Sequence, residues 1–498
     1  MNVERQTQLS PAPEPHFLEE ENLRMANQPW QTDDNHDPLG AFLDELTDPE
    51  VAEAEFRSDF FQGLGGRRKK SAFMLSFIWA IAFVLHSVSW GSTAVLGATG
   101  LLLVQAIRLV SAQPDPQPQP LADEDLTTAP IVSLIVSAKN EEAVIGRLVK
   151  NLCQLDYPTA KCEVWLIDDA STDKTPQILD QLALEYPQLK VVHRSPNAGG
   201  GKSGALNQVL AQTQGEIIAV FDADATVPSE FLRHVVPLFA DENVGAIQVR
   251  KAIANEPLNF WTKGQATEMI LDSYFQQQRI ALGGIGELRG NGQFVRRSAL
   301  DQCGGWNEET ITDDLDLTIR LHLDNWKIGF LLNPAVNEEG VTKAIALWHQ
   351  RSRWAEGGYQ RYLDYWRYFS NKRLGFGKKV DLFSFILMQY LLPTAAIPDF
   401  IFAVLKGHLP VLMPMTTLAL GLSLWAMVQG NMRVYRELPW TWAKVTKIFT
   451  ACGLTMVYML HWMVVMPLTT ARMSVRPKRL KWVKTTHQGE EESFVSQT

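Results

Sequence analysis

The stretch that decides the fold is residues 217–224 (IIAVFDAD), in which five apolar residues run directly into Asp222, Ala223 and Asp224. A short apolar run without polar alternation is typical of a strand that is buried on both faces of a sheet. Similar runs precede it at residues 131–136 (IVSLIV), 164–167 (VWLI) and 191–192 (VV). Stretches with a helical pattern separate these runs, and this alternation predicts a parallel sheet covered by helices. The sequence therefore predicts an α/β domain, which we place at residues 130–355.

Carboxylate side chains follow the predicted strands at the point where each strand ends. Asp168 and Asp169 follow one apolar run, and Asp222 and Asp224 follow another. In an open α/β sheet, ligands bind beyond the carboxyl ends of the strands. Unpaired charge at the end of a buried strand is costly, and Mg²⁺ removes that cost by taking carboxylate oxygens together with substrate phosphates. We therefore expect Asp222 and Asp224 to hold Mg²⁺, or Mn²⁺ in its place, with a diphosphate substrate.

A third acidic run, residues 312–316 (TDDLD), opens a stretch with a helical pattern. Taken alone, this run is explained by a helix N-cap. Three acidic clusters at three loop starts instead favour one shared site, and Asp314 is then a candidate catalytic carboxylate.

Two glycine-rich segments are further candidates for ligand contacts. Residues 197–204 (NAGGGKSG) precede a helical stretch, and their glycines would let Lys202 reach a phosphate. A flexible surface loop is the alternative for this segment. The second segment is Gly290, Asn291 and Gly292, which we assign to the acceptor side; a plain turn is the alternative.

The chain before the α/β domain has the composition of a membrane hairpin. Residues 71–107 contain no Asp, Glu, Lys or Arg. This uncharged stretch is nearly long enough for two membrane spans of about 20 residues each. Four basic residues at 67–70 precede them and favour a cytoplasmic start. We therefore expect a two-helix hairpin at residues 67–112 and a Pro-rich linker at 113–129. A hairpin buried in a large core is the alternative.

The chain after the α/β domain holds three apolar stretches, within residues 381–471. They lie at residues 382–405, 409–432 and 448–471, with basic residues between and after them. Three full crossings would place one basic cluster outside, against the usual preference for basic loops on the cytoplasmic side. We therefore expect residues 382–405, which contain Pro393, Pro398 and Asp399, to lie in the membrane interface or to re-enter.

The charge distribution argues against a nucleic-acid partner. Residues 1–60 carry 15 acidic and 3 basic side chains, while the formal charge of the whole chain is −9, so the remainder is slightly positive. Nucleic-acid binding needs a strongly basic face. We expect residues 1–66 to form an acidic, disordered head and residues 472–498 a basic and then polar tail. The four cysteines form no CxxC pair, so neither a disulfide framework nor a zinc site is expected.

Residues 356–380 are dense in tyrosine, tryptophan, arginine and lysine. Such a mixture is typical of segments at the headgroup level of a bilayer. We therefore expect an interfacial segment here, next to the first apolar stretch that follows. An ordinary amphipathic helix packed on the sheet is the alternative.

Five motifs, in this order along the chain, resemble those of the family-2 inverting glycosyltransferases, which have a GT-A fold. They are residues 136–142 (VSAKNEE), 168–173 (DDASTD), 222–224 (DAD), 312–314 (TDD) and 350–354 (QRSRW). Two departures stand out. The first motif is usually Pro-x-Tyr-Asn-Glu, whereas Ser137 and Lys139 occupy its first and third positions here, and Asp313 replaces the glutamate of a Thr-Glu-Asp motif.

The resemblance implies a role for each matching residue. Glu141 and Asp169 would contact the uridine, and Asp222 and Asp224 would hold the donor diphosphate through Mg²⁺. Asp314 would be the general base. Gln350, Arg353 and Trp354 would face the diphosphate and the acceptor entrance. An inverting transfer is a single in-line displacement, which needs one carboxylate to take the acceptor proton.

The acidic head, the paired N-terminal spans and the strings IVSLIVSAKNEE and QRSRWAEG look most like one branch of that family, the cyanobacterial β-monoglucosyldiacylglycerol synthases. This resemblance implies UDP-glucose as donor and 1,2-diacylglycerol in the bilayer as acceptor. It also implies a multi-pass membrane protein of the thylakoid or plasma membrane, with a cytoplasmic catalytic domain. Processive polysaccharide synthases of the cellulose or hyaluronan type, which typically carry more spans, are one alternative. A transferase for another lipid, such as a ceramide, and a non-enzymatic scaffold are the others.

Overall fold

The structure is a computed structural model that describes residues 67–366, 369, 374–436 and 438–475. The predicted acidic head at residues 1–66 and most of the predicted tail lie outside these residues.

The α/β domain contains a seven-stranded sheet in the order β3-β2-β1-β4-β6-β5-β7. The strands are β1 (Val132–Ala138), β2 (Cys162–Asp168), β3 (Leu189–His193), β4 (Ile217–Phe221), β5 (Val244–Ile253), β6 (Gln293–Arg296) and β7 (Lys327–Glu338). The four strands predicted from the sequence, β1 to β4, are all parallel, as expected. The sheet as a whole is mixed, because β6 runs antiparallel to both β4 and β5.

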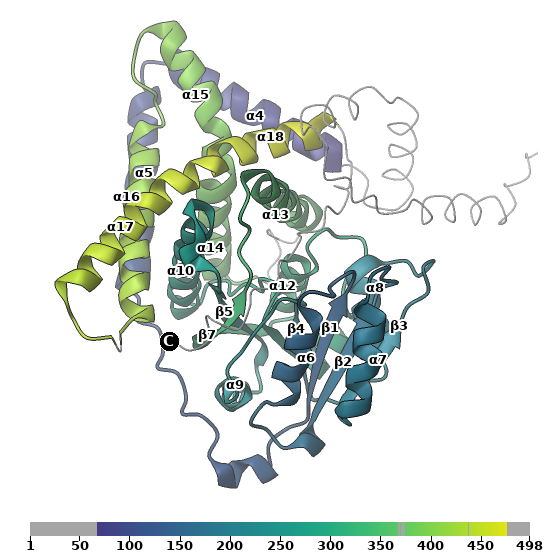
Figure 1. Cartoon of the computed structure of the whole chain (residues 1–498). Coiled ribbons are helices and arrows are strands. Elements are labelled where there is room, and N and C mark those ends of the chain that lie inside the picture. The colour runs from purple at the N-terminus through teal and green to yellow at the C-terminus, as the bar shows by residue number, and fades with distance from the viewer. Residues whose placement is uncertain (1–66, 367–368, 370–373, 437, 476–498) are drawn as a thin grey trace, which may run out of the picture.

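Helices cover both faces of this sheet and bury its apolar side chains (Figure 1). Helices α6 (Ile145–Cys153) and α7 (Thr175–Glu185) pack on one face, around Leu134, Leu166 and Phe221. Helices α8 (Gly201–Leu210), α11 (Arg297–Gln302) and α12 (Asp313–Leu323) cover the other face. Burial on both faces explains why these strands are continuous apolar runs in the sequence.

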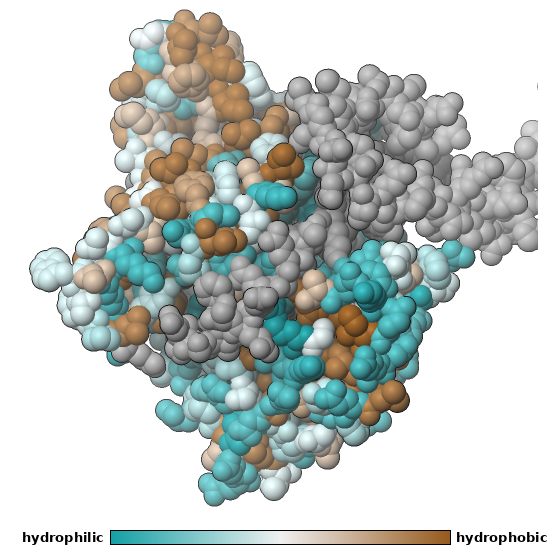
Figure 2. All heavy atoms as spheres, in the orientation of Figure 1, coloured by the Kyte–Doolittle hydropathy of each residue, from teal (hydrophilic) through white to brown (hydrophobic). Residues whose placement is uncertain are grey.

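Long helices from both ends of the chain form a second layer beside the α/β domain (Figure 1). They are α4 (Arg67–Ser87), α5 (Gly91–Ser111), α14 (Phe376–Ile386), α15 (Leu392–Lys406), α16 (Met413–Val434), α17 (Trp442–Tyr458) and α18 (Trp462–Val475). Helix α10 (Phe260–Ala281) packs against both β5 and these helices, so it joins the two layers. In Figure 2 hydrophobic residues gather on the part formed by these long helices, whereas hydrophilic residues dominate over the α/β domain.

Among the described residues, four helical stretches are long and apolar enough to cross a membrane: Arg67–Ser87, Gly91–Ser111, Phe376–Lys406 and Trp442–Val475. The first two are separated by three residues and lie within the hairpin predicted at residues 67–112. The third includes the segment that we expected in the interface. Its length and apolar composition would allow a crossing, and the interfacial or re-entrant placement stays a prediction.

The predicted interfacial segment at residues 356–380 begins inside the protein instead. Helix α13 (Ala344–Tyr365) contains its first part, and Tyr359, Arg361 and Tyr362 are buried there. The guanidinium of Arg361 lies 3.2 Å from the carboxylate of Glu287, which explains why a cation is found in this interior. These side chains do not face a bilayer, so the alternative of a helix packed against the protein describes this part. Residues 367–368 and 370–373 lie outside the described residues.

Candidate active site

The loops after β1 and β2 lie side by side because the two strands are parallel and in register, with Ala138 opposite Asp168. The backbone N–H of Asp169 donates to the carbonyl of Ala138 (2.8 Å). The N–H of Glu141 donates to the hydroxyl of Thr175 (2.8 Å). The two residues predicted to contact a nucleobase, Glu141 and Asp169, are therefore brought to the same edge of the sheet.

Asp169 is held by Arg194, a residue that the sequence analysis did not single out. Nη1 of Arg194 donates to Oδ1 of Asp169 (2.5 Å) and to the carbonyl of Gly201 (3.1 Å). Nη2 donates to the carbonyl of Gly199 (2.6 Å). One buried guanidinium thus fixes the glycine-rich segment against the loop after β2. The signal for Arg194 is its place directly after β3, the same position that made the aspartates candidates.

Lys202 lies in the first turn of α8, and its Nζ is 2.5 Å from Oδ1 of Asp222. Gly200 and Gly201 have positive φ angles of 80° and 53°, which bring the chain sharply into the helix. Burial lowers the pKa of Lys202, but the charge of Asp222, together with Asp313 and Asp314, outweighs it and raises that pKa above its usual value. Lys202 therefore lies at the acidic cluster, and its contact with a phosphate stays a prediction.

Asp222 and Asp224 follow β4, but their environments differ. The N–H of Asp222 donates to the amide oxygen of Asn291 (3.2 Å), and its carboxylate is partly exposed. Asp224 is buried, and its Oδ2 accepts a hydrogen bond from the N–H of Glu339 (2.8 Å), just beyond β7. Asp222 therefore presents the more accessible carboxylate of the pair.

The turn formed by Gly290, Asn291 and Gly292 connects the Asp222 side of the site to Asp314. Asn291 is buried, and besides its contact with Asp222 it donates to Glu338 (3.2 Å). Gly290 has a φ of 79°, and a Cβ at this position would lie 3.4 Å from Oδ2 of Asp314. The turn therefore runs directly beside the proposed base, and its glycine leaves room next to that carboxylate.

Asp313 and Asp314 lie in the first turn of α12, with Thr312 at the N-cap. Oδ1 of Asp314 accepts a hydrogen bond from the N–H of Leu315 (2.8 Å). Burial and the neighbouring charge of Asp313 raise the pKa of Asp314 to about 6. Burial also raises the pKa of Asp313. A carboxyl with this pKa is ionised at neutral pH and is still basic enough to take a proton from an alcohol in the transition state.

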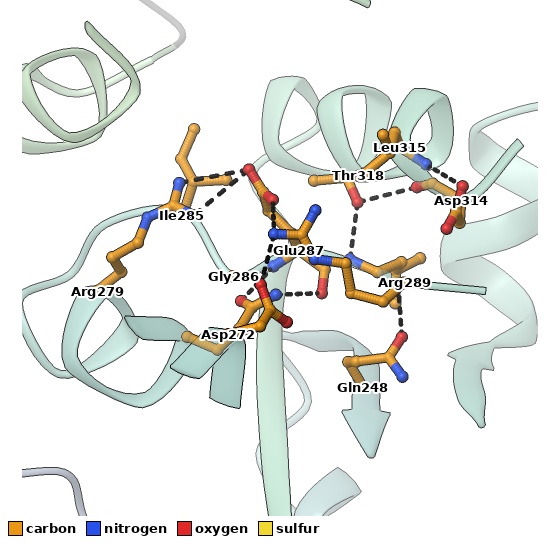
Figure 3. A network of polar contacts seen from close by, with 12 residues as sticks. Gln248, Asp272, Arg279, Ile285, Gly286, Glu287, Arg289, Asp314, Leu315 and Thr318 are labelled. Carbon is orange, nitrogen blue, oxygen red and sulfur yellow. Dashed lines mark hydrogen bonds and ion pairs between the residues drawn. The ribbon is translucent and has the colours of Figure 1, made fainter. Parts of the chain in front are cut away.

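A buried polar network extends from Asp314 into the protein (Figure 3). The hydroxyl of Thr318 donates to the carbonyl of Asp314 (2.9 Å) and accepts from the N–H of Leu288 (2.9 Å). Leu288 lies between Glu287 and Arg289, and the Glu287 carboxylate is 2.7 Å from the guanidinium of Arg289.

Two further arginines, Arg279 and Arg361, lie 3.4 Å and 3.2 Å from the carboxylate of Glu287. Arg279 also pairs with Asp381 of α14 (3.0 Å). The loop before Gly290 thus connects helix α14 to the segment beside Asp314. The sequence analysis missed this cluster, because nothing in the spacing of these residues shows that they converge.

The QRSRW motif lies on α13, but its members point to different surroundings. Lys251 Nζ stacks on the ring of Trp354, 5.1 Å from its centre, and lies 3.3 Å from Glu338, the partner of Asn291. Trp354 is therefore connected to the acidic cluster. Burial lowers the pKa of Arg353 to about 10. Gln350 accepts a hydrogen bond from Arg351 (2.9 Å), and no described contact brings it to the carboxylates.

Arg351, within the same motif, is fully buried and was also missed. Its guanidinium pairs with Glu268 of α10 and donates to the hydroxyl of Tyr458 (3.0 Å). Glu268 also accepts hydrogen bonds from Tyr458 (2.8 Å) and from the indole of Trp462 (2.8 Å). This buried cluster fixes α13 to the last two helices of the described chain.

The donor set at the sheet edge fits a divalent cation. Among the described residues, no group of three or more His, Cys, Asp or Glu forms a complete metal site. Two carboxylates after one strand match Mg²⁺ sites that are completed by substrate phosphates and water. Nearby, Oδ2 of Asp313 is buried without a hydrogen-bond partner in the described structure, which adds an oxygen that a cation or its water would satisfy.

Comparison with solved structures supports the fold assignment. A mannosyltransferase from Pyrobaculum calidifontis, solved in complex with GDP-Man and Mn²⁺, aligns with 78% of this chain and 99% of its own chain, with a TM-score of 0.52 and 23% identity. This likeness confirms the GT-A fold.

Sequence comparison identifies the family. The pattern of glycosyl transferase family 2 matches residues 133–304. The β-monoglucosyldiacylglycerol synthase of Synechocystis sp. is 60% identical over 93% of this chain and 97% of its own length. The synthase of the same name from Trichormus variabilis is 57% identical over 92% of this chain and 98% of its own length. The chain therefore belongs to glycosyl transferase family 2, together with these β-monoglucosyldiacylglycerol synthases.

Proposed function

We propose that this protein is a membrane-bound glucosyltransferase that transfers glucose from UDP-glucose to 1,2-diacylglycerol with inversion, giving β-monoglucosyldiacylglycerol. The observation that carries the proposal is the single turn from Gly290 to Gly292. Its Asn291 accepts the N–H of Asp222, and a Cβ at its Gly290 would lie 3.4 Å from Oδ2 of Asp314. A donor diphosphate bound at Asp222 would then lie next to a base that activates an acceptor alcohol. The two synthases that resemble almost the whole chain support glucose and diacylglycerol as the substrates.

The donor would lie along the edge of the sheet. Glu141 and Asp169 would contact the uracil and ribose, and Lys202 would reach a phosphate. Asp222 and Asp224 would hold Mg²⁺, with Mn²⁺ as a substitute, and the bound cation would neutralise charge on the leaving UDP. Gln350, Arg353 and Trp354 would close the diphosphate side and border the acceptor entrance.

The reaction then needs one proton transfer. Asp314 takes the proton of the 3-hydroxyl of diacylglycerol while that oxygen attacks the anomeric carbon of glucose from the face opposite to UDP. The bond between the anomeric carbon and the phosphate oxygen breaks in the same step, and the sugar configuration inverts. The raised pKa of Asp314 suits this role, because a stronger base accepts the proton more readily.

A lipid acceptor agrees with the architecture. Diacylglycerol keeps both acyl chains in the bilayer and offers one hydroxyl at its surface. The four candidate spans flank the α/β domain in the sequence, and α13, which carries Trp354, packs against α18 and α4. An active site close to the bilayer surface would reach the hydroxyl without extracting the lipid.

The test is to incubate the purified full-length chain with labelled UDP-glucose in diacylglycerol-containing vesicles and to identify the product by mass. We expect a single hexose on diacylglycerol with β linkage by NMR, no activity with EDTA and recovery with Mg²⁺. A labelled polymer that stays at the origin in lipid chromatography would instead favour a processive polysaccharide synthase. Parallel reactions with UDP-galactose and with ceramide test the donor and the acceptor.

A further inference from the structure

We propose that Lys202 holds the cation position at Asp222 when no nucleotide is bound, so that the divalent cation enters together with the donor. This inference rests on the metal role proposed above for Asp222 and Asp224. It concerns the order in which the ligands bind, which that role leaves open.

The contact between Lys202 and Asp222 is incompatible with a cation at the same oxygen. Nζ of Lys202 lies 2.5 Å from Oδ1 of Asp222. A bound Mg²⁺ would lie about 2.1 Å from a carboxylate oxygen, so an ammonium and a divalent cation would repel each other at that place. Asp224 is the less accessible carboxylate, because its Oδ2 already accepts the N–H of Glu339. A cation that arrives alone must therefore displace the lysine from the more exposed of the two carboxylates.

Arg194 holds the backbone around Lys202, so release of Asp222 would require movement of the lysine side chain alone. Arg194 binds the carbonyls of Gly199 and Gly201, on both sides of the sharp entry into α8, and also binds Asp169. The Lys202 side chain is 24% exposed, and its ammonium is carried on a flexible aliphatic chain. Rotation of this one side chain would free Asp222 without rearranging the loop.

A nucleoside diphosphate supplies what the cation alone lacks. Its phosphate oxygens offer Lys202 a new anionic partner, so the ammonium can leave Asp222 without losing the ion pair that it makes there. The same phosphates complete the coordination of the metal. The nucleotide and the cation should therefore raise each other's affinity, and Lys202 should be responsible for much of this coupling.

The test measures Mn²⁺ binding by the full-length protein in detergent, from the electron paramagnetic resonance signal of free Mn²⁺, with and without UDP. For the wild type we expect weak binding alone and binding about tenfold tighter with UDP. Lys202→Met keeps the length of the side chain and removes its charge, so it should bind Mn²⁺ about tenfold more tightly than the wild type when UDP is absent. Lys202→Arg, the charge-preserving control, should keep the requirement for UDP, and Asp222→Asn should lose Mn²⁺ binding in both conditions.

Two results would overturn the inference, and they are distinguishable. If Lys202→Met binds Mn²⁺ no more tightly than the wild type without UDP, the lysine does not hold the cation position, and the proposed function stands. If the wild type binds no Mn²⁺ even with UDP, the metal role of Asp222 and Asp224 fails as well. Wild-type measurements of UDP affinity at increasing Mn²⁺ keep the test valid should a variant fold poorly: independence of the two affinities would also contradict the proposal.

Discussion

Asp314 is the residue on which the proposed chemistry depends most directly. Asp314→Asn keeps the size of the side chain and removes the base, so we expect turnover to fall by about 10²- to 10⁴-fold with little change in thermal stability. The matched control is Glu309→Gln, which changes an exposed carboxyl in the preceding loop and should leave turnover unchanged. Full turnover in Asp314→Asn would remove the assignment of the base.

The pKa of Asp314 also predicts a pH dependence. Burial and Asp313 raise this pKa to about 6, from an ordinary value near 4. The base is active when deprotonated, so activity should be complete above this pKa and should decline as the pH falls through about 6. Asp313→Asn removes the neighbouring negative charge and should shift the acid limb of kcat to lower pH. An acid limb that stays in place would show that Asp313 does not act on the base.

At the scale of the element, the turn at Gly290 offers a matched pair of variants. Gly290→Ala forces a side chain into a φ of 79° and places its Cβ 3.4 Å from Oδ2 of Asp314. Gly283→Ala meets a similar backbone cost at a φ of 68°, with no heavy atom within 4 Å of the new Cβ. We expect each to lose about 1–2 kcal/mol of stability, and only Gly290→Ala to lose turnover as well. Equal turnover in the two variants would argue that the turn does not border the reacting groups.

The strands and part of the candidate site could be predicted from the sequence. The apolar runs predicted β1 to β4 because strands buried on both faces have a simple pattern, and Asp222, Lys202 and Asp314 were found because they follow these strands or open helices. The cluster of Glu287 with Arg279, Arg289 and Arg361 could not be predicted. Those charges are buried by long-range pairing, which composition does not reveal. For the same reason, composition alone placed the segment that contains Arg361 at the membrane surface, whereas Arg361 is buried.

For the whole molecule, the four candidate spans favour an integral membrane protein. The basic residues at 67–70 predict that the α/β domain and the chain start lie on the cytoplasmic side. After a carbonate wash at high pH, the full chain should remain in the membrane pellet, whereas a peripheral protein is released. In sealed inside-out vesicles, protease should cleave the linker at residues 113–129, and in right-side-out vesicles it should not. Protection in the first preparation would reverse the proposed orientation.

The buried cluster of Arg351, Glu268, Tyr458 and Trp462 sets a boundary for engineering this enzyme. A version shortened before α17 to make it water-soluble would lack Tyr458 and Trp462. The ion pair between Arg351 and Glu268 would then lose two hydrogen-bonding neighbours, and its charges would no longer be enclosed by the protein. Such a fragment should be poorly folded even though the entire sheet is retained. We therefore expect that the catalytic part of this chain cannot be separated from its last helices, and that detergent or nanodiscs will serve its preparation better than truncation.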